Sequence, residues 1–293
     1  ADDPFMFSSQ NEQDNRYYSK LAGLPMLEPS SAQEAKDMAV DAFDLSEQLQ
    51  LPVIFRTTTR INHSTEIVTL GDIQSSGTKG DFKKDPFSYV PVPAVSRILH
   101  AKLLKKIDKA RELSKSSKHN FISGKGYWGI ICNGVSYNYV CDAVTDLDIE
   151  NSIRILRIGF SHPMPGVLIQ DFLKECEKVL VVEEGEPFME EAVKAFAQEA
   201  GLTLPITGKD DHHLSRLYEY NPAQVRECLA AYFGVDYTPR VGVDLSDVPE
   251  IPQRPPSLCA GCSHRATFYA VNKAAKGMET ICPTDIGCYT LGF

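Results

Sequence analysis

The first strong pattern in this chain is an amphipathic stripe between residues 31 and 50. Its apolar positions recur at helical spacing, at Ala35, Met38, Ala42, Leu45 and Leu49. This spacing predicts a helix with one face turned to a core, and Ser31 followed by Glu34 matches a capping box at its start. The short β-branched run at 51–59, which is entered through Pro52, predicts a strand. A helix leading into a buried strand is typical of the α/β class.

Residues 126–208 alternate between two kinds of apolar pattern. Apolar runs of strand type fall at 127–134, 153–160, 178–185 and 202–208, and helical patterns separate them at 135–144, 165–177 and 187–200. Four strands joined by three helices predict a parallel sheet with helices on both faces, which is a three-layer α/β domain. Asn221 and Pro222 then predict the start of one more helix, as N-cap and first helical residue.

The segments between these patterns lack a sustained apolar period. Residues 3–18 are rich in Ser, Gln, Asn and Asp, which favours a loop presented to a ligand or a partner. Residues 71–93 are predicted to be a linker, and 94–118 a basic helix that packs on a surface between domains. The prolines of 247–257 indicate a stiff linker.

Composition places the chain among globular proteins. With 293 residues, of which 43% are apolar, it is long enough for two domains with their own cores. No apolar run approaches the roughly 20 residues that cross a bilayer, and residues 1–10 do not resemble a signal peptide, so we expect a cytoplasmic protein without membrane contact. The net charge of −9 opposes nucleic-acid binding, since the basic stretch at 102–111 looks like a helix surface.

The eight cysteines fall into two groups. Cys132, Cys141, Cys176 and Cys228 lie in apolar periodic segments, and we predict that they are core residues; Cys259, Cys262, Cys282 and Cys288 cluster near the end. Cys259-x-x-Cys262 lets two thiolates reach one metal from a tight turn, and Cys288 could supply a third. A zinc knuckle serving as a docking module would satisfy the same spacing, and a thiol redox protein would need only the pair.

The residues around these cysteines carry a family resemblance. The stretches RPPSLCAGCSHR (254–265) and TDIGCYTLGF (284–293) resemble motifs of the alpha subunits of indolepyruvate ferredoxin oxidoreductases. Further stretches that resemble this family in the same order are 3–18, 27–38, 53–64, 84–94 and 134–140. Thr284 and Phe5 depart from the family pattern, since glycine is usual at both positions.

The resemblance implies a fold and a division into domains. It implies parallel-sheet domains of the thiamine-diphosphate-enzyme type, with a transketolase C-terminal-like domain in the middle. Residues 1–75 would be the latter part of an aminopyrimidine-binding domain, and 76–118 a linker and basic helix. Residues 119–245 would form the transketolase C-terminal-like domain, and 250–293 the start of a diphosphate-binding domain. The chain would then be a fragment lacking both ends and inactive alone.

The resemblance also implies an activity with its cofactors and partners. The family converts aryl pyruvates such as indolepyruvate and phenylpyruvate, with CoA, to aryl-acetyl-CoA and CO2, and reduces ferredoxin. The intact subunit is expected to hold thiamine diphosphate, Mg2+ and [4Fe-4S] clusters, and to work with a smaller beta subunit.

Site residues follow from the same resemblance. Cys259, Cys262 and Cys288 are expected as ligands of a [4Fe-4S] cluster, with packing as the alternative role. Predicted cofactor-binding residues are Ser8, Ser9, Gln10, Asn11, Asp285, Ile286, Gly287 and Cys288. Arg16 is predicted to bind the oxoacid carboxylate through two parallel hydrogen bonds, unless it is a solvated loop charge. His264 is predicted to assist proton transfer, unless it merely caps the next helix.

Overall fold

The computed structural model describes the chain apart from residues 8, 10, 74–79, 210–213, 240, 241, 243, 245, 251, 253, 254, 284–286 and 293. The contacts divide it into two compact units, Ala1–Pro239 and Arg240–Phe293. The predicted domain boundaries inside the first unit remain predictions. None of the helices in the described parts of the chain is long and apolar enough to cross a bilayer.

A five-stranded sheet forms the centre of the first unit. Its strands are β3 (Asn120–Gly124), β4 (Trp128–Cys132), β5 (Ile153–Ile158), β7 (Lys178–Val182) and β8 (Ile206–Thr207). The order is β3-β5-β4-β7-β8, and β5, β4, β7 and β8 run parallel, which confirms the four predicted parallel strands. Strand β3 was not predicted, and it lies antiparallel to β5 at the edge of the sheet.

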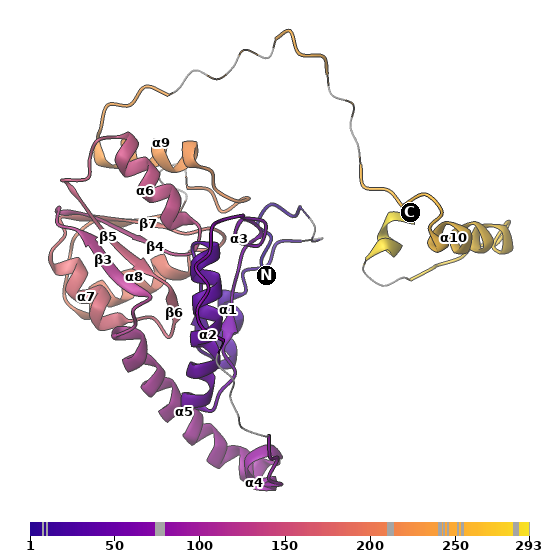
Figure 1. The fold of residues 1–293 in the computed structure, drawn as a ribbon, viewed down its shortest axis with the longest axis horizontal. Helices are drawn as coiled ribbons and strands as arrows, with labels where there is room; N and C mark the ends of the chain where they lie inside the picture. Colours follow the sequence, from indigo (N-terminus) through magenta and orange to yellow (C-terminus); the bar gives the residue numbers. More distant parts are fainter. Residues whose placement is uncertain are drawn as a thin grey trace. The chain divides into compact units, whose positions relative to one another are not determined.

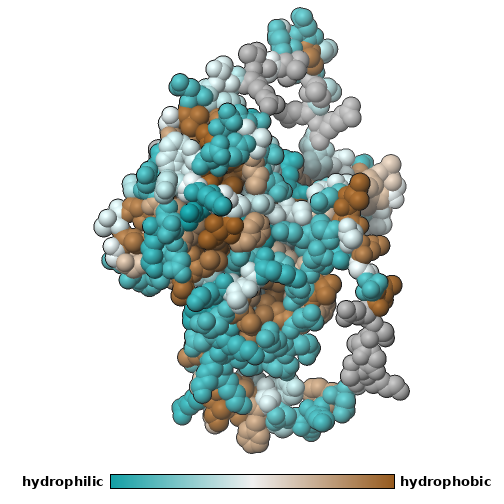
Figure 2. All heavy atoms as spheres, turned by 60° about the vertical axis from the view of Figure 1, so that its left-hand side comes forward, coloured by the Kyte–Doolittle hydropathy of each residue, from teal (hydrophilic) through white to brown (hydrophobic). Residues whose placement is uncertain are grey.

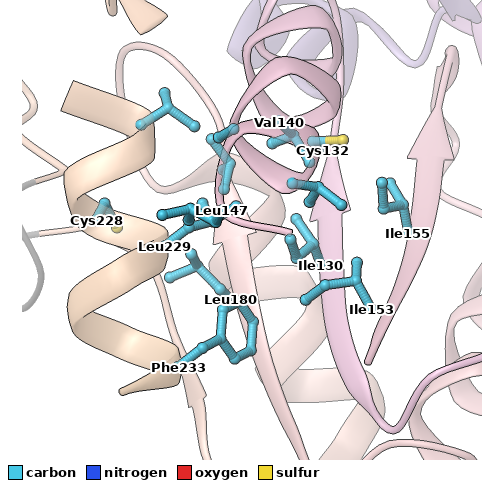
Figure 3. Packing of buried hydrophobic residues seen from close by; sticks show 14 of the residues in the cluster. Ile130, Cys132, Val140, Leu147, Ile153, Ile155, Leu180, Cys228, Leu229 and Phe233 are labelled. Carbon is cyan, nitrogen blue, oxygen red and sulfur yellow. The ribbon is translucent and has the colours of Figure 1, made fainter. Parts of the chain in front are cut away.

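Helices cover both faces of this sheet (Figure 1). They are α6 (Ser136–Asp146) and α9 (Pro222–Phe233) on one face, and α7 (Gly166–Lys174) and α8 (Phe188–Glu199) on the other. Because successive strand residues point to opposite faces, Ile130 packs with α6 and α9 while Ile131 packs with α7 and α8. Figure 3 shows Leu229 and Phe233 of α9 directed toward the strands. The predicted three-layer α/β architecture is therefore confirmed.

The four scattered cysteines are core residues, as predicted. Cys132 and Cys228 are buried, and Cys141 and Cys176 are partly buried. Burial raises the pKa of the Cys176 thiol to about 11 and that of Cys228 to about 12, so both stay protonated and inert at neutral pH.

A smaller three-stranded sheet joins the start of the chain to the central region. Strand β1 (Met26–Leu27) lies between β2 (Ile54–Phe55), which is parallel to it, and β6 (Phe160–His162), which is antiparallel. The strand predicted at 51–59 is thus only two residues long, because its partner β1 offers it two residues to pair with. The run predicted as one strand at 153–160 is divided between β5 and β6.

The helices of this region begin with α1 (Arg16–Ala22), which was not predicted within the expected loop. The others are α2 (Ala32–Leu49), α3 (Thr59–Asn62), α4 (Pro86–Tyr89) and α5 (Pro93–Lys115). At α2 the Ser31 hydroxyl accepts from the Glu34 N–H at 3.1 Å, which confirms the predicted cap. The Glu34 carboxylate accepts from the Ser30 N–H at 2.8 Å and pairs with buried Arg157, so it does not close the predicted capping box with Ser31.

The predicted basic helix α5 packs against the C-terminal end of α2. Lys106 donates to the carbonyl of Gln50 at 2.7 Å, and Lys109 donates to that of Gln48 at 3.3 Å. Cations are favourable at this end of a helix because its carbonyls lack partners. On the face that Figure 2 draws, hydrophilic side chains cover much of the surface and apolar ones emerge between them.

The second unit contains α10 (Ser263–Ala274) and a 3-10 helix, η1 (Cys288–Gly292). Neither helix has a buried residue. The two pack together through the aromatic ring of Tyr289, which meets His264 edge-on at 4.6 Å between centroids.

Candidate functional site

The carboxyl ends of the parallel strands carry a concentration of buried polar residues. Asn133 follows β4, Glu183 and Glu184 follow β7, and Lys209 follows β8, all at most 6% exposed. Ligands of open α/β sheets collect at this edge, where strands turn into helices. The opening segment of the chain reaches the same edge through Arg16.

Arg16 connects the opening segment to the end of β7. Its guanidinium is fully buried, pairs with Glu183, and donates to both carboxylate oxygens of Asp14, at 2.8 and 2.5 Å. It also donates to the carbonyls of Glu184 and Glu186 at 2.7 and 2.8 Å. These contacts use the guanidinium N–H groups that would bind an oxoacid carboxylate. The geometry therefore favours a role for Arg16 in positioning the opening segment.

Glu183 is held from three sides. Besides pairing with Arg16, it accepts from the backbone N–H groups of Met189 and Glu190 at the start of α8, at 2.9–3.0 Å. Burial raises the pKa of Glu183, while Arg16, Lys209 and the N–H groups oppose that shift. The Glu183 carboxylate therefore holds together the end of β7, the start of α8 and the opening segment.

Asp14 and Arg16 shift each other's pKa in opposite directions. Burial by itself would raise the pKa of Asp14, but its hydrogen bonds to Arg16 and the charge of that guanidinium lower it. Burial likewise opposes the charge on Arg16, yet Glu183 and Asp14 hold its pKa well above the usual value. Both groups remain ionised at neutral pH.

A second arginine joins the start of the chain to the small sheet. Arg56 donates to Asp2 at 2.5 Å and to Glu28 at 2.7 Å, and Asn133 donates to the same Glu28 oxygen at 2.7 Å. The other oxygens of Asp2 and Glu28, and the hydroxyl of Thr58, are buried and have no hydrogen-bond partner within the part of the chain that the structure describes. Acceptors of this kind fit an ordered water molecule or the hydrogen-bond donors of a ligand.

Lys209 is a buried cation at the end of β8. Its ammonium donates to the carbonyl of Glu183 and to the hydroxyl of Tyr220, and it lies 4.6 Å from the Tyr220 ring centroid. Burial lowers the pKa of Lys209 to about 8, and Glu183 opposes that shift. This lysine is therefore close to its titration range at physiological pH.

The opening segment carries the other predicted residues of the first unit. Ser8 and Gln10 lie outside the described residues. The Ser9 N–H donates to Asp3 at 3.1 Å, its hydroxyl donates to the Asn11 carbonyl at 3.2 Å, and both Ser9 and Asn11 are exposed. Their predicted cofactor contacts remain predictions.

The predicted metal ligands lie in the second unit. The Cys262 N–H donates to the Cys259 carbonyl at 3.2 Å, which forms the expected tight turn, and the Cys262 sulfur lies 3.2 Å from His264 Nδ1. Cys288 begins η1 after Gly287, whose φ of 120° suits glycine. Among the residues that the structure describes, no three His, Cys, Asp or Glu side chains gather closely enough to hold a metal. Asp285 and Ile286 lie outside that set.

Sequence reasoning missed Glu183, Glu184 and Lys209 as members of the edge cluster. A signal was present for the two glutamates, because they directly follow the apolar run of β7. Charged residues at the end of a buried parallel strand point to the ligand edge of the sheet. The same signal was present for Lys209, which directly follows the strand predicted at 202–208, but no sequence pattern showed its burial against Tyr220 of a later loop.

Comparison with known proteins gives a consistent set of relatives, although no family model matches the chain. Over its whole length it is 46% identical to "Indolepyruvate oxidoreductase subunit IorA" of Methanothermobacter thermautotrophicus and covers 48% of that protein. The proteins of the same name from Thermococcus kodakarensis and Archaeoglobus fulgidus are 46% and 41% identical over the whole chain, which covers 46% and 47% of them.

A solved structure is also similar, the 2-oxoglutarate:ferredoxin oxidoreductase from Magnetococcus marinus with 2-oxoglutarate, coenzyme A and succinyl-CoA bound. It shares 17% identity over 71% of this chain and 42% of its own, with a TM-score of 0.47. The chain spans about half the length of the curated relatives it matches.

Proposed function

Because the chain belongs to the family of indolepyruvate oxidoreductase subunit IorA, we propose that it is part of an enzyme that oxidatively decarboxylates aryl pyruvates. One aryl pyruvate and one CoA would give aryl-acetyl-CoA and CO2, while two electrons pass to ferredoxin. The observation that carries the proposal is 46% identity over the whole length of the chain. A smaller beta subunit is the proposed partner.

Thiamine diphosphate with Mg2+, when bound, would supply the carbanion chemistry of decarboxylation. One feature of the first unit supports its binding. Glu28 directly follows β1, Thr58 lies beyond β2 in a bridge with Asp2, and each of the three has a buried side-chain oxygen with no hydrogen-bond partner among the described residues. These acceptors fit amino donors such as those of an aminopyrimidine ring. Arg16 and Glu183 would hold the opening segment beside them.

A four-iron cluster is the proposed ligand of Cys259, Cys262 and Cys288. Thiolates are the donors that such clusters take, and all three thiols are free and at least partly exposed. His264 contacts the sulfur of Cys262 and would orient it. The described cysteines do not converge on one point, so cluster binding would draw Cys288 toward the Cys259–Cys262 turn.

The function is tested with the complete subunit assembled with its smaller partner under anaerobic conditions. We expect indolepyruvate to reduce a viologen dye only when CoA and thiamine diphosphate are present. Residues 1–293 alone are expected to be inactive, because the relatives are about twice as long. Absence of reduction with indolepyruvate and phenylpyruvate alike would refute the proposed function.

Metal analysis separates the proposed cluster from the other uses of the same cysteines. Anaerobically purified complete subunit should contain iron and sulfide, and the Cys259→Ser and Cys288→Ser variants should each lose about four iron atoms per chain. The Cys282→Ser variant is a matched control that should retain them. Stoichiometric zinc would indicate a zinc knuckle, and a reversible disulfide without metal a thiol redox pair.

A further inference from the structure

Three aromatic rings form an exposed cluster between two loops of the first unit. Phe5 stacks on Phe7 at 4.7 Å between centroids with an interplanar angle of 24°, and it meets Tyr218 at 5.0 Å. The three residues are 45%, 59% and 46% exposed. Single exposed apolar side chains are ordinary, but contacting aromatic rings that leave half their area in solvent form a surface suited to a ligand.

The backbone under this cluster adopts an unfavourable conformation. Tyr218 has φ 67° and Met6, between the two phenylalanines, has φ 59°. This left-handed region disfavours residues with a Cβ, at a cost of about 1–2 kcal/mol each. Backbone strain of this kind persists where the surroundings impose it, and it concentrates at functional sites.

Ion pairs and buried contacts impose the conformation of the loop that carries Tyr218. Arg216 pairs with Glu186, and Glu219 pairs with Arg60. The Tyr220 N–H donates to buried Glu184 at 2.9 Å. The contacts of the residues before and after Tyr218 thus hold this part of the loop in place.

The opening segment is fixed on the other side of the cluster. The Met6 N–H donates to the Asp3 carbonyl at 2.9 Å, and the Thr59 hydroxyl donates to the Asp3 carboxylate at 3.0 Å. Glu186 links this segment to the loop that carries Tyr218, because its carbonyl accepts from Arg16 while its carboxylate accepts from Arg216. The aromatic cluster therefore adjoins the carboxyl-end edge of the parallel sheet, where ligands bind.

We propose that the cluster of Phe5, Phe7 and Tyr218 binds the aryl ring of the 2-oxoacid substrate and selects aryl over aliphatic side chains. This inference rests on the proposed function for the identity of the ligand. An incoming ring would stack on faces that are now exposed, and stacked aromatic pairs gain stability beyond the area that they bury. An aliphatic 2-oxoacid offers no such face.

The test uses the complete subunit with its partner and compares phenylpyruvate with pyruvate. The Phe7→Leu variant removes one ring, and Tyr218→Gly removes another while glycine accepts the left-handed backbone without strain. We expect each to lower the ratio of kcat/KM for phenylpyruvate to that for pyruvate about tenfold, and to raise the Kd for phenylpyruvate in equilibrium dialysis similarly. Tyr218→Phe, which keeps the ring, should recover the ratio lost in Tyr218→Gly.

The matched control is Phe43→Leu, which removes an exposed ring of α2 and should change neither quantity. If the loop variants shift the ratio and the Kd less than twofold, as the control does, the cluster does not bind the substrate ring. If the unmodified complex turns over no 2-oxoacid, the proposed function fails, and dialysis of phenylpyruvate still decides whether the cluster binds an aryl acid.

Discussion

At the scale of single residues, two buried arginines determine where the opening segment lies. Arg16 pairs with Asp14 and Glu183, and Arg56 pairs with Asp2, Asp14 and Glu28, so each arginine joins the start of the chain to a distant strand end. Buried pairs cost desolvation when they form, and their net stabilisation is small. Removing one partner is costly, because it leaves an uncompensated charge in the interior.

The first prediction concerns the pair of Arg16 and Glu183. The Arg16→Met variant should lower the free energy of unfolding by about 3–5 kcal/mol, since Asp14 and Glu183 would stay buried without their cation. Urea unfolding followed by the fluorescence of Trp128, the single tryptophan, measures this change. Arg111→Met, which breaks an exposed pair with Asp108, should change the same quantity by less than about 0.5 kcal/mol. Equal effects of the two substitutions would contradict the structural role of Arg16.

The second prediction concerns the pH dependence that Lys209 gives to stability. Its pKa is lowered from 10.5 to about 8 by burial, so between these values the unfolded chain binds more protons than the folded one. Stability should therefore rise with pH across this window, by about 2 kcal/mol from pH 8 to pH 10 for this group. We expect the unfolding free energy of the unmodified protein, minus that of the Lys209→Met variant, to increase by that amount from pH 8 to pH 10. A pH-independent difference would show that Lys209 does not titrate in the folded state below pH 10.

At the scale of elements, local sequence signals explain the ends of helices better than the ends of strands. The Asn221 side chain accepts from the Gln224 N–H at 3.0 Å, and the Asn221 N–H donates to the Gln224 side chain at 3.2 Å, which completes the capping box of α9. The apolar run at 153–160 is divided at Gly159, whose N–H donates to the His119 carbonyl at 2.9 Å and whose carbonyl accepts from the Glu28 N–H at 2.8 Å. A Cβ at Gly159 would lie 2.2 Å from the Arg157 guanidinium, so this glycine leaves the space that the arginine occupies.

The third prediction follows from the cap of α9. Replacing Asn221 by Ala should lower the free energy of unfolding by about 1 kcal/mol, because the Gln224 N–H loses its partner at the start of a helix that covers the core. Asn221→Asp should keep the cap and remain within a few tenths of the unmodified value. Thermal unfolding by circular dichroism distinguishes the two, and equal melting temperatures for Ala and Asp would speak against the cap.

At the scale of the whole molecule, stability is concentrated in the first unit. The three clusters of buried apolar residues belong to Ala1–Pro239, whereas neither helix of Arg240–Phe293 has a buried side chain. Helices of 12 residues are marginal without tertiary packing. The two units should therefore differ strongly in protection of their backbone amides.

The fourth prediction is that residues 1–239 fold without the remainder. Their urea midpoint, followed at Trp128, should match that of the full chain, because this ring stacks on Phe233 within the first unit at 5.1 Å. In the full chain, amides of α10 should exchange with deuterium much faster than those of β4. A lower midpoint for the shortened chain, or slow exchange in α10, would mean that the second unit gains its stability by packing on the first.

The sequence by itself determined the architecture of the central region, because the periods of its apolar residues decide which face each element buries. Four parallel strands, two helical layers and the core cysteines all follow from that local rule. Only the tertiary structure decided the antiparallel β3, the passage from β5 to β6 and the convergence of Arg16 with Glu183. These features depend on contacts between residues up to 167 positions apart, and no local period encodes which charges meet across such a distance.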